Sequence, residues 1–125
     1  MSIPKDLKYT KEHEWIKLDG SIATVGITEF AQRELGDIVY VEVDTEGEEL
    51  DVEEVFGTIE AVKTVSDLFI PVAGEVLEFN EALEDEPELI NNDPYGEGWI
   101  IKLKVKNLDD INSLLEADAY QKIIK

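Results

Sequence analysis

The chain has 125 residues, a length that suits one domain spanning residues 1–125. It contains no cysteine and one histidine, which excludes disulfides, thiolate metal ligands, a cysteine nucleophile and a His-rich metal site. The formal net charge of −19 argues against nucleic acids and anionic membranes, which bind Lys and Arg, and favours protein partners with basic docking surfaces.

We expect no targeting segment at the N-terminus. Residues 1–5 contain neither an apolar signal region nor an Arg-rich amphipathic stretch. Elsewhere, no stretch approaches the roughly 20 apolar residues needed to span a bilayer. We therefore expect a cytoplasmic protein, or one from which a transit peptide has been removed.

The first regular structure predicted is a hairpin. Residues 9–18 begin irregularly and become a strand, Asp19-Gly20 is a favourable hairpin turn, and residues 21–27 return as the partner strand. We expect His13 to be a structural hydrogen-bonding residue. Thr28 can cap a short helix over residues 28–35, which Gly36 can end, and we expect this helix to contribute packing only.

The second half of the chain alternates strands, turns and short helices. Residues 37–43 and 99–105 are predicted strands, and residues 81–92 a loop or a single helical turn. Gly47 and Gly74 are predicted to mark comparable turns. Near the C-terminus, Asn107 can cap one helix and Asp118 a second short turn that carries Tyr120, Ile123 and Ile124 inward.

A predicted β-hairpin over residues 55–70 holds an isolated cation. Val55, Gly57, Ile59 and Ala61 recur at period two, so they are predicted to line one buried strand face. Residues 64–70 read as the returning strand. Lys63 lies near the reversal and is the only Lys or Arg between Arg33 and Lys102, in a strongly acidic part of the chain.

Four blocks of sequence, in order, resemble the H-protein family of the glycine cleavage system. The hairpin block is Glu60-Ala61-Val62-Lys63-Thr64, with Ser66-Asp67 and Pro71-Val72-Ala73-Gly74-Glu75-Val76 after it. The other blocks are Tyr9-Thr10 through His13-Glu14-Trp15, Val25-Gly26-Ile27-Thr28 through Leu35-Gly36-Asp37-Ile38-Val39, and Leu89-Ile90-Asn91 through Pro94-Tyr95, Gly98 and Trp99. Together they cover nearly the whole chain.

This resemblance implies a mainly β fold, a barrel-sandwich hybrid, with short helices at about residues 28–35 and at the C-terminus. It also implies a carrier with no catalytic turnover of its own, in which (R)-lipoate is attached covalently to Lys63. The arm would take the aminomethyl group of glycine from glycine decarboxylase (P-protein) to aminomethyltransferase (T-protein). Dihydrolipoamide dehydrogenase (L-protein) would reoxidise it. We expect a monomer, since a shuttle needs its arm free.

The resemblance further implies roles for two carboxylates, and two more are candidates by their position in the sequence. Residues matching Glu14 and Asp67 lie in a cleft that holds the loaded arm, whose amine is cationic near neutral pH and would be bound well by carboxylates. Glu12 is a weaker candidate for the same cleft. Glu60, three residues before Lys63, is a candidate recognition point for lipoate-attaching enzymes. Each of these carboxylates could equally be an ordinary surface or turn residue.

Three other functions remain open at this stage. The hairpin could belong to a lipoyl or biotinyl domain of another multienzyme complex, although biotinyl domains usually place methionines beside the lysine, where this chain has Val62 and Thr64. The protein could serve mainly to relay lipoyl groups to other proteins. Finally, Glu14 and Asp67 could form the paired carboxylates of an acid–base hydrolase.

Overall fold

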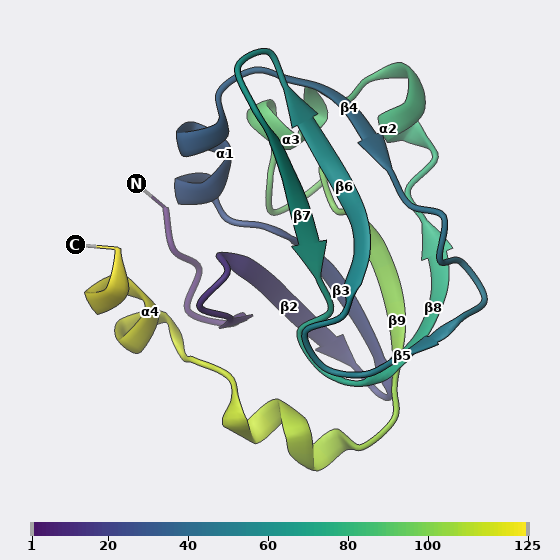
Figure 1. The fold of residues 1–125 in the computed structure, drawn as a ribbon. Coiled ribbons are helices and arrows are strands. Elements are labelled where there is room, and N and C mark those ends of the chain that lie inside the picture. The colour runs from purple at the N-terminus through teal and green to yellow at the C-terminus, as the bar shows by residue number, and fades with distance from the viewer. Residues whose placement is uncertain (1, 125) are drawn as a thin grey trace.

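The computed structural model describes residues 2–124, whose strands form two antiparallel sheets (Figure 1). The larger sheet has the strand order β1-β2-β3-β9-β8-β5, and the smaller has the order β4-β6-β7. In chain order the elements are β1 (Lys8–Tyr9), β2 (Glu14–Asp19), β3 (Ile22–Ile27), α1 (Glu29–Leu35), β4 (Ile38–Glu42), β5 (Glu49–Leu50), β6 (Val55–Ala61), β7 (Val65–Phe69), β8 (Gly74–Phe79), α2 (Ala82–Asp85), α3 (Leu89–Asn92), β9 (Ile101–Val105), the 3-10 helix η1 (Leu108–Ser113) and α4 (Ala117–Ile123).

One apolar core joins the two sheets. Val25 and Leu103 of the larger sheet are fully buried in the same cluster as Phe56 and Ile59 of the smaller sheet. Burial of such side chains contributes roughly 1.5–3 kcal/mol each, so this cluster is the main force that holds the sheets together. Within residues 2–124, none of the helices is long and apolar enough to cross a membrane.

The β6–β7 hairpin forms as predicted, apart from one residue. Gly57, Ile59 and Ala61 are buried, but Val55 is exposed, so its assignment to the buried face was wrong. The pairing register shifts between Val55 and Gly57, which places Phe56 in the core instead. A β-bulge of this kind interrupts the period of two on which the prediction depended.

Helix α1 begins and ends where the sequence predicts. The Thr28 hydroxyl accepts a hydrogen bond from the Ala31 amide at 3.2 Å, which satisfies one of the free N–H groups of the first turn. Gly36 follows the last turn with φ of 84°, a conformation that favours glycine. The helix is therefore fixed locally at both of its ends.

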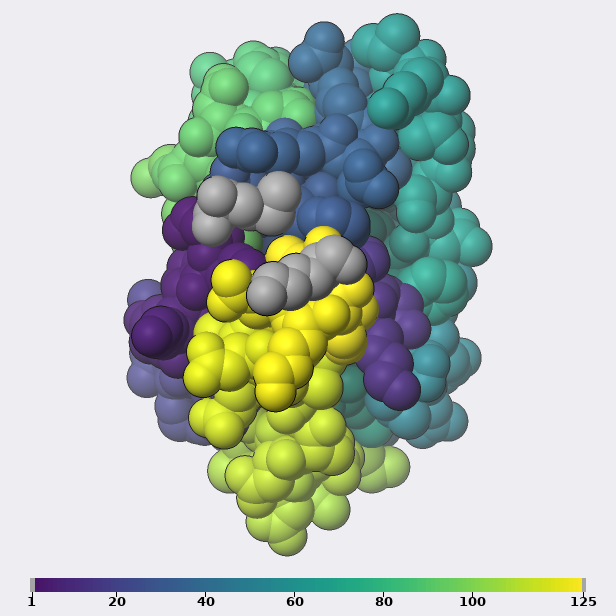
Figure 2. All heavy atoms as spheres, turned by 90° about the vertical axis from the view of Figure 1, so that its left-hand side faces the viewer, coloured from purple at the N-terminus to yellow at the C-terminus, as the bar shows by residue number. Residues whose placement is uncertain are grey.

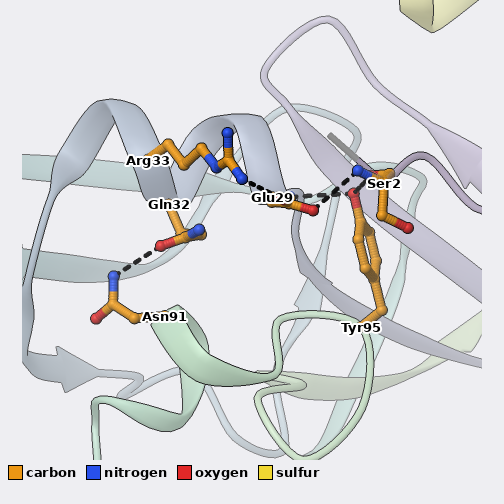
Figure 3. Close-up of polar contacts among 6 residues, drawn as sticks. All are labelled: Ser2, Glu29, Gln32, Arg33, Asn91 and Tyr95. Atoms are coloured by element: carbon orange, nitrogen blue, oxygen red, sulfur yellow. Dashed lines mark hydrogen bonds and ion pairs between the residues drawn. The ribbon is translucent and has the colours of Figure 1, made fainter.

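Residues from the far end of the chain hold α1 in place (Figure 3). The Tyr95 hydroxyl accepts a hydrogen bond from the Glu29 amide at 3.0 Å. The side-chain amide of Asn91 donates to Gln32 Oε1 at 2.8 Å and to the carbonyl of Gly36 at 2.9 Å. The Leu89–Trp99 block of sequence thus determines where α1 lies.

The structure differs from the prediction at Gly74 and in the segment 81–92. Gly47 has φ of 87° and lies in a turn, whereas Gly74 begins β8 and pairs with Leu50. A Cβ at Gly74 would collide with the carbonyl oxygen of Lys104, so close strand approach explains this glycine. The segment 81–92 forms two short helices, and it is tied to the core by the buried side chains of Leu83 and Ile90.

The C-terminal segment packs on the N-terminal segment (Figure 2). Asn107 caps η1 as predicted, its side chain accepting from the Asp109 amide at 3.0 Å. Asp118 does not cap α4; Glu116 occupies that position without a side-chain hydrogen bond.

The inward side of α4 is also only partly as predicted. Tyr120 is fully buried and stacks on Tyr9, with ring centroids 4.8 Å apart. Ile124 packs against the same cluster. Ile123 is 44% exposed, so its predicted inward position was wrong.

Candidate functional site

Lys63 lies in the tight turn between β6 and β7. The Ala61 amide donates to the carbonyl of Thr64 at 2.7 Å, and the Val62 amide donates to the carbonyl of Asp37 at 3.0 Å. These bonds fix the backbone of the turn on either side of the lysine, whose side chain is exposed. The site therefore presents one accessible amine from a rigid support.

A cleft of about 200 Å³ lies between α1, the turn before β2, and β7. Three of the predicted carboxylates, Glu12, Glu14 and Asp67, line this cleft together. Its full lining is Glu12, His13, Glu14, Ile27, Phe30, Ala31, Glu34, Leu35, Ile59, Ser66, Asp67 and Leu68. The aliphatic part of the Lys63 side chain lies near the C-terminal end of α1, since a Cβ built on Gly36 would lie 3.5 Å from Lys63 Cε.

Glu14 is the most unusual group of the cleft because the residue is only 2% exposed. Its Oε2 accepts from the Phe69 amide on the open edge of β7 at 2.8 Å, and its Oε1 accepts from the Thr10 hydroxyl at 3.3 Å. Burial raises the pKa of Glu14 to about 8, although these two hydrogen bonds oppose the shift. At neutral pH the carboxyl group is therefore mostly protonated.

The other two predicted cleft carboxylates are exposed. Asp67 lies on β7 opposite Thr58, and Glu12 lies in the turn before β2. The cleft therefore combines two exposed carboxylates with one buried carboxyl group. These three groups can bind a small cation, while the apolar walls of the cleft contact the rest of the ligand that bears the cation.

Helix α1 supplies a wall of the cleft, which corrects the expectation that it contributes packing only. Phe30, Ala31, Glu34 and Leu35 all line the cleft. The side chains at positions 30 and 34 lie one helical turn apart and therefore share a face. That i, i+4 spacing of an aromatic and a carboxylate was visible in the sequence, but nothing there indicated which element the face meets.

His13 has the structural hydrogen bond that was predicted for it, and it also borders the cleft. Its Nδ1 lies 2.9 Å from the Tyr120 hydroxyl, and its backbone is left-handed with φ of 70°. Burial lowers the pKa of His13, so the imidazole is neutral at physiological pH. The ring packs beside Phe30, with centroids 4.9 Å apart.

Glu60 is separated from the other carboxylates. It is exposed on β6, paired with Tyr40 of β4 on one side and Val65 of β7 on the other. The neighbouring Ile59 is buried, so Glu60 points to the opposite, outer face of the smaller sheet. The structure thus divides the predicted residues between a cleft and an open surface.

Comparison with known proteins gives consistent results. Residues 7–125 match the family model described as Glycine cleavage H-protein. The glycine cleavage system H proteins of Bacteroides fragilis and Pelodictyon phaeoclathratiforme are each 60% identical to this chain, covering 99% and 98% of it and 98% of their own length.

The fold has a solved counterpart. The crystal structure of a glycine cleavage system H protein from Mycobacterium marinum superposes with a TM-score of 0.86 at 39% identity, covering 96% of this chain and 97% of that one. This likeness confirms the predicted barrel-sandwich hybrid. Together the family model, the relatives and the shared fold establish that the chain belongs to the glycine cleavage H-protein family, whose members are lipoyl carriers.

Proposed function

We propose that Lys63 is the lipoyl attachment site and that residues 1–125 act as a single carrier domain. The observation that carries this proposal is the position of Lys63, exposed on a hydrogen-bonded turn beside a cleft. Its amine can form an amide with the lipoate carboxyl group, and its four-carbon stem lengthens the arm. No enzymatic activity of the chain itself is part of this function.

The residues around Lys63 fit lipoate. The apolar side chains of Phe30 and Leu35 in the cleft suit the hydrocarbon and sulfur parts of such an arm. When bound, lipoate supplies the disulfide and dithiol chemistry on which the one-carbon amine is carried. The chain needs no cysteine for this role, because the reacting sulfur atoms belong to the cofactor.

We further propose that Glu14, Asp67 and Glu12 hold the cationic amine of the carried group in the cleft. A cation beside Glu14 lowers the pKa of this carboxyl group and favours release of its proton. The ionised group keeps its bonds from Phe69 and Thr10 and still has lone pairs for the amine. The hydrogen bonds would then be charge-assisted and shielded from water.

The proposed partners are those of the glycine cleavage system. They are glycine decarboxylase, aminomethyltransferase, dihydrolipoamide dehydrogenase and the enzymes that attach lipoate. The net charge of −19 supports fast, salt-sensitive encounters with basic surfaces on these enzymes. We place these encounters in the cytoplasm, in keeping with the bacterial relatives of the chain.

Substitution of Lys63 tests the attachment site. Lys63→Arg keeps the positive charge but cannot form the amide, so we expect complete loss of the lipoyl adduct with an unchanged fold. Intact mass and peptide mapping, after incubation with lipoate, ATP and a lipoate-attaching enzyme, measure the outcome. A matched control is Lys102→Arg, which should leave one adduct. An adduct on Lys63→Arg, or none on the unaltered protein, would contradict the proposal.

Substitution of Glu14 tests the cleft. Glu14→Gln keeps the shape and the bond from the Phe69 amide but cannot become an anion, so the loaded protein should lose its amine group several-fold faster. The release rate is measured by mass spectrometry of the loaded protein over time. Exposed Glu48, which lies outside the cleft lining, provides the control Glu48→Gln. If both variants released the group at the wild-type rate, Glu14 would have no holding role.

A further inference from the structure

Four exposed apolar side chains gather around the tip of the β6–β7 hairpin. They are Val39 at 46% exposure, Tyr40 at 49%, Val65 at 63% and Val62 at 75%. We call these four residues the tip patch. Val62 has the largest exposed fraction among the large apolar residues of the described chain. Clustered exposure of this kind is unusual on a surface that only needs to be soluble.

The strand register brings the tip patch together. Tyr40 pairs with Glu60, and Glu60 pairs with Val65, so these three residues form one row across β4, β6 and β7. Residues in register on neighbouring strands point to the same face. All three are exposed, which identifies this face as the outer side of the smaller sheet.

A β-bulge in β4 adds a second exposed apolar residue. The pairing passes from Ile38 opposite Ala61 to Tyr40 opposite Glu60, which leaves Val39 as the extra residue. Ile38 is buried, whereas Val39 and Tyr40 are both exposed. Without the shift, strand alternation would turn one of these two side chains inward.

The surroundings of the tip patch are acidic. Residues 34–101 contain 21 of the 30 Asp and Glu residues and a single Lys or Arg, Lys63 itself. Glu60 lies within the row, and Glu42 of β4 lies in the next row of the same face. Association of two copies through this face would bring acidic rims together, so a second copy of the chain is disfavoured. A partner with an apolar centre and a cationic rim is complementary.

The position of the patch selects one such partner. An enzyme that modifies the Lys63 amine has to reach it along a stem of only four carbons, so it must cover the residues beside the turn. Enzymes that act on the end of a long attached arm are under no such restriction. The hydrogen bonds that fix residues 61–64 also hold this surface rigid for docking.

We propose that the tip patch, together with Glu60, is the docking surface for the lipoate-attaching enzyme. The inference rests on the proposed attachment at Lys63 and extends the predicted role of Glu60 to apolar residues on β4 and β7. Tyr40 and Val65 supply apolar contact on either side of Glu60, and Glu60 selects a cationic rim. Amphipathic aromatic residues such as Tyr40 commonly carry much of the energy of such an interface.

The test measures lipoylation kinetics of four proteins with a lipoate-attaching enzyme. Tyr40→Thr and Val65→Thr remove apolar contact but keep a residue that favours strands. Val55→Thr is the matched control, because Val55 is an exposed valine of the same sheet at the end of β6 away from the turn. We expect the KM for the carrier to rise about tenfold in the first two variants, with little change in kcat, and to be unchanged in the control.

The outcomes separate the docking proposal from the carrier proposal. The docking proposal would be overturned by equal KM values for Tyr40→Thr, Val65→Thr and Val55→Thr, or by a loss confined to kcat. Lipoylation of the wild type would still support the carrier function in that case. If the wild type gained no adduct, both proposals would fail. Matching melting temperatures for all four proteins are expected. As a second measurement, Glu60→Gln should weaken the salt dependence of KM, and an unchanged dependence would remove Glu60 from the surface.

Discussion

The two sides of the β6–β7 hairpin differ in which side chains they bury and which they expose. On the cleft side, Glu14 is buried and hydrogen-bonded to the open edge of β7, while α1 closes the opposite wall. On the outer side, Tyr40 and Val65 are exposed although they are apolar. Both arrangements are unusual, because carboxyl groups normally face water and large apolar side chains normally lie in the interior.

This difference indicates two kinds of binding on one hairpin. A buried carboxyl group loses solvation free energy that a small cationic ligand can restore, so the cleft suits a small charged group. Exposed apolar side chains regain free energy only when another macromolecule covers them, so the outer face suits a protein. Lys63 lies between the two sides, where an attached arm could turn to either.

The largest expected effect is the pH dependence of the stability that Glu14 contributes on the cleft side. Its pKa is about 8 in the folded protein and about 4.3 in the unfolded chain, so the folded state binds the proton more tightly. Its contribution to stability is complete below about pH 4 and is lost as the pH rises through about 8. The Glu14→Gln variant does not lose stability in this way, because the glutamine side chain cannot release a proton. Between pH 5.5 and 8.5, the variant should gain about 3 kcal/mol in unfolding free energy relative to wild type.

Urea denaturation at several pH values measures this difference. Glu48→Gln, which changes an exposed carboxylate outside the cleft lining, serves as the control and should follow the wild-type profile. A constant difference between Glu14→Gln and wild type across the range would mean that the Glu14 carboxyl group titrates normally. The two sides of the hairpin would then be less different than the structure indicates.

A smaller effect is expected from removing the hydrogen bonds that hold α1, which forms one wall of the cleft. The Asn91 side chain donates to Gln32 Oε1 and to the carbonyl of Gly36, and it accepts from the Ile38 amide at 2.9 Å. Asn91→Ala removes all three bonds at a partly buried site, which should cost about 2 kcal/mol of unfolding free energy. Chemical denaturation measures the loss, and hydrogen exchange in α1 should rise.

The neighbouring Asn92 provides the control for this prediction. It is exposed, so Asn92→Ala should stay within about 0.5 kcal/mol of wild type. If the two alanine variants were equally stable, α1 would be held mainly by its apolar contacts. The wall of the cleft would then not depend on the Leu89–Trp99 block.

The sequence by itself determined the local elements and the isolated lysine. Thr28 and Gly36 delimit α1 because capping and left-handed backbone depend on the residue at that position. Strands 38–42 and 101–105 follow from alternation and β-branching. Lys63 was identifiable because one cation interrupts a long acidic segment within a family motif.

Only the tertiary structure decided which side chains meet. The bulges at Val39 and at Val55–Gly57 are one-residue register shifts, and they depend on pairing between strands that the sequence does not display. In the same way, the burial of Glu14 requires β7 and Thr10 to converge from distant parts of the chain. Local propensity specifies the elements of this protein, whereas long-range packing sets the solvation of its carboxylates and the faces of its strands.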